Sequence, residues 1–192
     1  MRISIHLPVA LTATRAVLAP LLLLLAFAWP NETVFGVVLV LALISDVLDG
    51  VIARKLGVAT PGLRRFDSVT DSVFYLCAVV ASWHVHETQL REFLIPLVIL
   101  LLLELARYTF DYIKFRREAS YHMWSSRAWG AALFVGFFSL LALGQGGWPI
   151  ALAIYLGIVA DVEGLAISVV LKKWQTDVPT IFRALQLRRS EA

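Results

Sequence analysis

The sequence is poor in charged residues, which fill 16% of its 192 positions, whereas hydrophobic residues fill 59%. A typical soluble domain carries about 25% charged residues. A soluble chain of this length could not bury so much apolar surface, but a lipid bilayer can solvate it. The composition therefore indicates a membrane protein with room for one domain.

Cysteine is almost absent, because Cys77 is the one cysteine and it lies within an apolar run. This excludes an intramolecular disulfide and a Cys-x-x-Cys metal site. The net charge of +3 would suit nucleic acid in a soluble protein. Here the basic residues stand at the ends of apolar runs, as in membrane proteins, so we expect no nucleic-acid partner.

Six apolar runs are long enough to cross a bilayer, which takes about 20 residues in a helix. They cover residues 9–29, 33–53, 67–86, 92–113, 128–146 and 149–171. The sequence thus predicts an all-α fold, an integral membrane bundle of six transmembrane helices. Residues 1–175 would form this domain, with a short interfacial helix as a candidate at its N-terminus, and residues 176–192 a basic tail.

Lysine and arginine collect in alternate links between these runs. The basic segments are 54–65, 114–127 and 172–189, whereas the opposite links hold Arg91 alone. Because cytoplasmic segments of membrane proteins are enriched in Lys and Arg, the pattern predicts that both termini lie in the cytoplasm.

Four aspartates stand around one of the basic links, where charge is otherwise scarce. Asp46 and Asp49 are three residues apart near the end of the second run, and Asp67 and Asp71 are four apart at the start of the third. Each spacing places both carboxylates on one helix face. If the two helices pack antiparallel, the pairs face each other, and cations are needed to offset their repulsion. Oxygen ligands of this kind suit Mg²⁺, Mn²⁺ or Ca²⁺, and we expect two Mg²⁺ or Mn²⁺ ions.

Small residues and an arginine share the helix face of the first aspartate pair. Gly50 and Ala53 would let a bulky nucleotide approach closely, and Arg54 offers a guanidinium fork that suits a diphosphate. The alternative is that the aspartates pair with nearby arginines and only orient the helices. All four aspartates at this spacing, with the small residues between them, favour a functional site.

The segment from Asp46 to Asp71 resembles the signature of the CDP-alcohol phosphotransferase family, D-x2-D-G-x2-A-R-x8-G-x3-D-x3-D. The aspartates, the first glycine, the alanine and the arginine match in type and spacing. Leu63 stands where the family has its second glycine. A second, shorter similarity to phospholipid-synthesising members runs from Leu7 to Arg15.

The resemblance implies a fold, a reaction and roles for these residues. The family has six transmembrane helices and an active site near the cytoplasmic face. Asp46, Asp49, Asp67 and Asp71 would hold the metal, and Asp71 would also act as general base on the acceptor hydroxyl. Asp49, Gly50, Ala53 and Arg54 would contact the CDP part of the donor, and CMP would leave. The expected enzyme is phosphatidylglycerophosphate synthase-like, uses CDP-diacylglycerol and a small polar alcohol in a bacterial-type cytoplasmic membrane, and is often a homodimer.

The acceptor is less constrained by the sequence, and its candidates are cationic. Arg65, Arg107 and Arg127 would suit a phosphorylated alcohol such as glycerol 3-phosphate, and lipids of the inositol, serine or cardiolipin type are alternatives. Arg107 has Glu104 and Asp111 within one helical turn, so these carboxylates could instead neutralise it.

Two acidic residues in the last run, Asp161 and Glu163, are expected to make interhelical hydrogen bonds or a dimer contact. A cation-coupled carrier and an inactive family member are the rival functions. The carrier is disfavoured because the aspartates gather at one end of their helices and no internal repeat is present.

Overall fold

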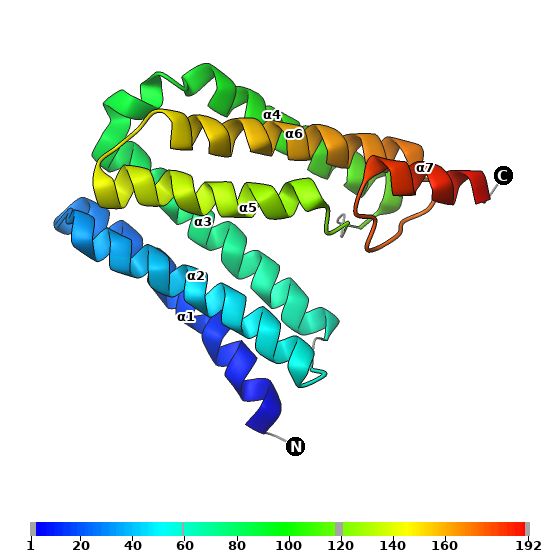
Figure 1. The fold of residues 1–192 in the computed structure, drawn as a ribbon, viewed down its shortest axis with the longest axis horizontal. Helices are drawn as coiled ribbons and strands as arrows, with labels where there is room; N and C mark the ends of the chain where they lie inside the picture. The colour runs from blue at the N-terminus through cyan, green and yellow to red at the C-terminus, as the bar shows by residue number, and fades with distance from the viewer. Residues whose placement is uncertain (1–2, 59, 118–120, 191–192) are drawn as a thin grey trace. The chain divides into compact units, whose positions relative to one another are not determined.

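The computed structural model describes residues 3–58, 60–117 and 121–190. Helices dominate this part of the chain (Figure 1). They are α1 (Ile3–Ala28), α2 (Glu32–Lys55), α3 (Pro61–Arg91), α4 (Leu94–Phe115), α5 (Trp124–Phe137), the π-helix η1 (Phe138–Ala142), α6 (Trp148–Val170) and α7 (Ile181–Ser190). The all-α class is confirmed.

The described residues divide into two compact units. The first runs up to Leu90 and adds Phe137–Gln145; the second comprises Arg91–Gly136 and the residues from Gly146 onward. The first unit therefore contains α1, α2, α3 and η1, and the second contains α4, α5, α6 and α7.

Five helical segments of the described chain are long and apolar enough to cross a membrane. They are His6–Ala28, Glu32–Lys55, Arg65–Arg91, Trp124–Ala142 and Trp148–Val170. The 22-residue helix α4 is not among them, and it carries Glu104, Arg107 and Asp111 in its second half. The structure thus supports five of the six predicted spans.

In the first unit, α1 and α2 run in opposite directions and pack along each other (Figure 1). The Asn31 side chain starts α2 by accepting a hydrogen bond from the Val34 amide at 3.0 Å, which satisfies one of the unpaired N–H groups of the first turn. Gly36 lets η1 approach α2, because a β-carbon there would lie 3.2 Å from Ala142 Cβ.

The third predicted span differs from the observed helix at its start. Residues from Pro61 onward are helical, six positions before the predicted start, and the Thr60 hydroxyl accepts a hydrogen bond from the Leu63 amide at 3.2 Å. A proline in the first turn fits because its missing N–H has no intrahelical partner there. Near the predicted end, α3 kinks at His86, whose φ and ψ are −129° and 40°.

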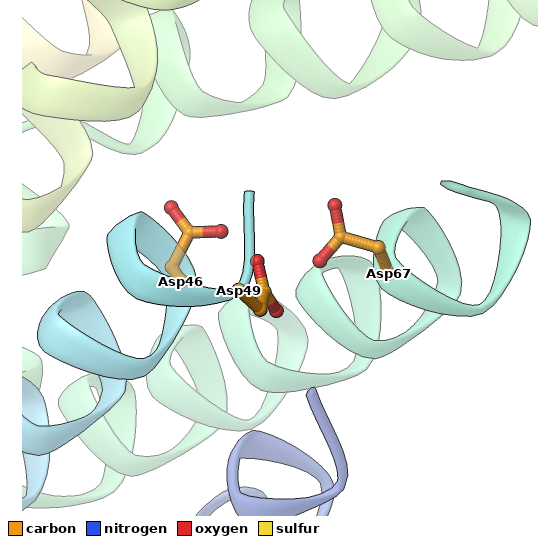
Figure 2. Close-up of side chains that lie close together, drawn as sticks. All are labelled: Asp46, Asp49 and Asp67. Carbon is orange, nitrogen blue, oxygen red and sulfur yellow. The ribbon is translucent and has the colours of Figure 1, made fainter. Parts of the chain in front are cut away.

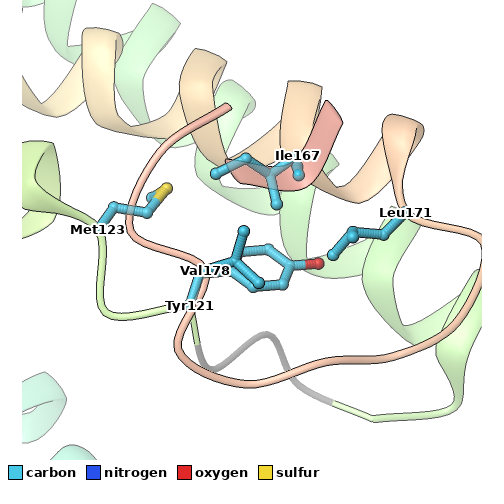
Figure 3. Close-up of a cluster of buried hydrophobic side chains, with 6 residues drawn as sticks. Tyr121, Met123, Ile167, Leu171 and Val178 are labelled. Atoms are coloured by element: carbon cyan, nitrogen blue, oxygen red, sulfur yellow. The ribbon is translucent and has the colours of Figure 1, made fainter. Parts of the chain in front are cut away.

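In the second unit, α6 packs against α4 and α7. One apolar cluster joins the end of α6 to the segments before α5 and around α7 (Figure 3). It consists of Tyr121, Met123, Ile167, Leu171, Val178 and Ala184. The Tyr121 hydroxyl lies 2.9 Å from Ser168 Oγ, which gives this buried polar group a partner.

Glu163 ties the two helices on either side of the cluster to α6. Its Oε2 accepts a hydrogen bond from Ser125 Oγ at 2.6 Å, and its Oε1 accepts one from the Ile181 amide at 3.3 Å. The interhelical hydrogen bonding expected for Glu163 is therefore present, and it fixes the start of α7.

Close packing in this unit depends on a glycine in α6. A β-carbon at Gly157 would lie 2.7 Å from Trp129 Nε1 and 2.8 Å from Leu100 Cδ1, closer than real contacts allow. We expect Gly157→Ala to lower the free energy of unfolding by about 1–3 kcal/mol, because the indole ring and Leu100 must both shift. Unfolding in mixed detergent micelles measures this change.

Gly130 in α5 is the matched control, because a β-carbon there meets no atom within 4 Å. Gly130→Ala should be neutral or should stabilise the helix by up to about 1 kcal/mol, as alanine favours the helix over glycine. Equal effects of the two substitutions would contradict the packing argument.

Candidate metal and phosphoryl-transfer site

The four aspartates of the motif come from two helices of the first unit. Asp46 and Asp49 lie one turn apart on α2, and Asp67 and Asp71 lie one turn apart on α3. Carboxylate oxygens of Asp46, Asp49 and Asp67 all lie within 4.8 Å of one another. Figure 2 shows the carboxylates of Asp46 and Asp67 on either side of Asp49. The predicted convergence of the two helices is therefore present in the structure.

The four carboxylates differ in their access to solvent. The Asp49 side chain is 5% exposed, whereas those of Asp46, Asp67 and Asp71 are 45%, 37% and 34% exposed. Asp49 thus lies on the buried side of the site, and the other three carboxylates lie on its solvent-accessible side.

An arginine that the motif does not include lies among these carboxylates. Arg15 of α1 places Nη1 2.8 Å from Asp46 Oδ1 and Nη2 2.6 Å from Asp49 Oδ2. Nη1 also pairs with Asp71, and Nη2 with Asp67. Arg15 is 2% exposed, so the ion pairs are shielded from water on the α1 side. Four carboxylates and one guanidinium leave a net charge of −3 when all are ionised.

Sequence reasoning missed Arg15 as a site residue, because an arginine beside the first apolar run resembles a flanking charge. The signal that could have found it was the short similarity running from Leu7 to Arg15. Thr12 belongs to the same segment, and its hydroxyl lies 2.7 Å from Asp49 Oδ2 and 3.1 Å from the Pro8 carbonyl oxygen. The single hydroxyl proton can be donated fully to one of these acceptors at a time.

The residues predicted to contact the donor lie along the same side of α2. Ala53 is buried, and the exposed Arg54 folds its guanidinium over Gly50, where a β-carbon would lie 3.3 Å from Nη1. The glycine therefore leaves room for the arginine tip. Leu63 lies in the first turn of α3 and is not among the described residues with positive φ, so its backbone does not require glycine.

The three acceptor candidates have different surroundings. Arg65 is exposed on α3, two residues before Asp67. The other two belong to the second unit, where Arg107 Nε lies 3.0 Å from Asp161 Oδ1 and the Arg127 guanidinium lies 4.9 Å from the centre of the Trp124 ring. Arg107 thus has a carboxylate partner on α6.

The donor set fits a hard divalent cation. Carboxylate oxygens are the ligands preferred by Mg²⁺ and Mn²⁺, and the net negative charge of the cluster attracts them. Carboxylates at this depth in apolar helices are costly unless cations offset them. These features define a class, membrane proteins with a carboxylate cluster that could hold a divalent metal.

A model of the CDP-alcohol phosphatidyltransferase family matches residues 5–170, which is most of the chain. The chain belongs to this family, whose members are transferases that move a phosphatidyl group from a CDP-alcohol to an alcohol acceptor in a membrane. The apolar helices and the family together make it an integral membrane protein. No curated protein and no solved structure matches the chain.

Proposed function

We propose that the protein transfers the phosphatidyl group of CDP-diacylglycerol to glycerol 3-phosphate and releases CMP. The observation that carries this proposal is the convergence of Asp46, Asp49 and Asp67 within 4.8 Å, at the spacing of the family signature. Inositol-, serine- or cardiolipin-type products are the alternatives.

We assign metal binding and donor binding to different residues of the first unit. Asp46, Asp49 and Asp67, together with Asp71, would hold one or two Mg²⁺ or Mn²⁺ ions, which supply positive charge to the diphosphate. Arg54 would engage the same diphosphate from the exposed end of α2, and Gly50 and Ala53 leave space for the nucleotide.

Asp71 is the proposed general base. An alcohol is a weak nucleophile at neutral pH, so removal of its proton by a positioned carboxylate accelerates attack. The acceptor oxygen bonds to the β-phosphorus of the donor as the bond from that phosphorus to the bridging oxygen breaks. The proton passes to Asp71, and CMP leaves with the electron pair of the broken bond.

We also propose a membrane setting for the enzyme. We propose that α4 also crosses the membrane, which brings the number of spans to six. Its Arg107 is neutralised by Asp161, so the helix can enter the bilayer. Both termini and the site would face the cytoplasm of a bacterial-type inner membrane, with residues 1–175 as the catalytic domain and 176–192 as a cytoplasmic tail. A homodimer is the expected assembly.

The test is CMP release by purified protein in detergent with CDP-diacylglycerol, Mg²⁺ or Mn²⁺, and a panel of alcohols. We expect release with glycerol 3-phosphate that stops when EDTA removes the metal, because uncompensated charge on the breaking diphosphate raises the barrier. Release with a different alcohol would correct the acceptor. Absence of release with every alcohol, from folded protein that binds metal, would favour the carrier or the inactive family member.

A further inference from the structure

Arg15 connects the two helices that carry the carboxylates. Each of its terminal nitrogens pairs with one carboxylate from α2 and one from α3. Nη1 takes Asp46 and Asp71, and Nη2 takes Asp49 and Asp67. A planar guanidinium can make these paired contacts because its N–H groups form a fixed fork, whereas an ammonium group is a single point of charge.

The carboxylates are also what holds the guanidinium in place. Arg15 is 2% exposed, and its Nε is buried without a hydrogen-bond partner among the described residues. A buried cation is stable only where nearby charges offset its lost hydration. The position of Arg15 therefore depends on the same four aspartates that would hold a metal.

A divalent cation bound by these aspartates would share their oxygens with Arg15. Like charges a few ångströms apart repel, and the repulsion is strong where water is excluded. The guanidinium thus has two opposite effects on the site. It draws α2 and α3 together, and it lowers the negative charge available to a metal.

We infer that Arg15 is a positioning residue that supplies one fixed positive charge to the carboxylate site and thereby weakens its affinity for divalent cations. The inference rests on the proposed metal-binding function of the aspartates. Arg15 would hold the four carboxylates close together. It would also weaken metal binding, so that a bound metal ion exchanges more readily.

The test compares Mn²⁺ affinity of the wild-type protein, Arg15→Met and Arg15→Lys by electron paramagnetic resonance, which reads free Mn²⁺ without substrate or turnover. Methionine removes the charge at similar volume, so we expect it to bind Mn²⁺ at least tenfold more tightly. Lysine keeps the charge, so its affinity should stay within about threefold of the wild type. Arg188→Met, which removes an exposed arginine of α7 in the second unit, is the control and should leave Mn²⁺ affinity unchanged.

A second variant covers the case in which Arg15→Met does not fold. Arg15→Met combined with Asp71→Asn restores the net charge of −3, so it should fold and should bind Mn²⁺ with nearly wild-type affinity. Unchanged or weaker Mn²⁺ binding by folded Arg15→Met would overturn the inference, as would tightening by the double variant as large as that expected for the single one. Because no outcome depends on CMP release, failure of the proposed reaction would remain distinguishable from failure of this inference.

Discussion

Asp71→Asn is expected to lower the rate of CMP release by about 10²–10⁴-fold, the usual contribution of a general base. Asparagine keeps the size of the side chain but cannot accept the acceptor's proton at neutral pH. Asp71 lies outside the group of three carboxylates that converge within 4.8 Å, so Mn²⁺ affinity should change far less than the rate. Steady-state rates measured over a range of Mg²⁺ concentrations check this expectation.

Asp46→Asn provides the comparison within the site, because Asp46 belongs to the three converging carboxylates. Its loss should raise the metal concentration needed for half-maximal rate, and excess Mg²⁺ should restore part of the activity. Asp177→Asn is the neutral control, since Asp177 is exposed and lies outside the site. Full recovery of Asp71→Asn at high Mg²⁺ would exclude proton transfer by Asp71 and leave it a metal ligand alone.

Arg107→Met is expected to lower the free energy of unfolding by about 3–5 kcal/mol, because it leaves Asp161 buried without its cation. Asp161 is 1% exposed, and Arg107 Nε lies 3.0 Å from its Oδ1. Arg107→Met combined with Asp161→Asn removes both charges and should recover most of the loss. Unfolding in mixed micelles measures all three proteins.

Arg127→Met is the control for this prediction, because its guanidinium is exposed over Trp124 and such a contact contributes at most about 1 kcal/mol. A small effect of Arg107→Met would contradict the stabilising role of the ion pair. The charge-free double variant also tests acceptor binding. An unchanged KM for glycerol 3-phosphate in that protein would remove Arg107 from the acceptor site.

The sequence was most informative where function depends on local spacing. Helical periodicity and a short link were enough to place two aspartate pairs on facing helices, Asp46 with Asp49 and Asp67 with Asp71. The apolar runs also located the helices, because the bilayer sets their length. The start of α3 was missed by six residues, since Thr60 and Pro61 begin the helix in a segment that is not apolar.

The charged residues buried within helices were harder to interpret. Arg107 had candidate partners in Glu104 and Asp111 on its own helix, and its ion pair with Asp161 of α6 could not be read from the sequence. The role of Arg15 depends on α1 packing along α2, which no periodicity specifies. In both cases the partner is distant in sequence, and only the packed helices bring the charges together.

The two parts of the first unit, the residues up to Leu90 and Phe137–Gln145, leave the ribosome at different times. Every carboxylate and cation of the proposed site lies at or before Asp71, whereas the π-helix η1 that packs on Gly36 begins at Phe138. At ribosomal rates of about 5–20 residues per second, roughly 3–13 seconds separate these segments. The charged cluster can therefore assemble in the nascent chain before the segment that completes its unit has been translated.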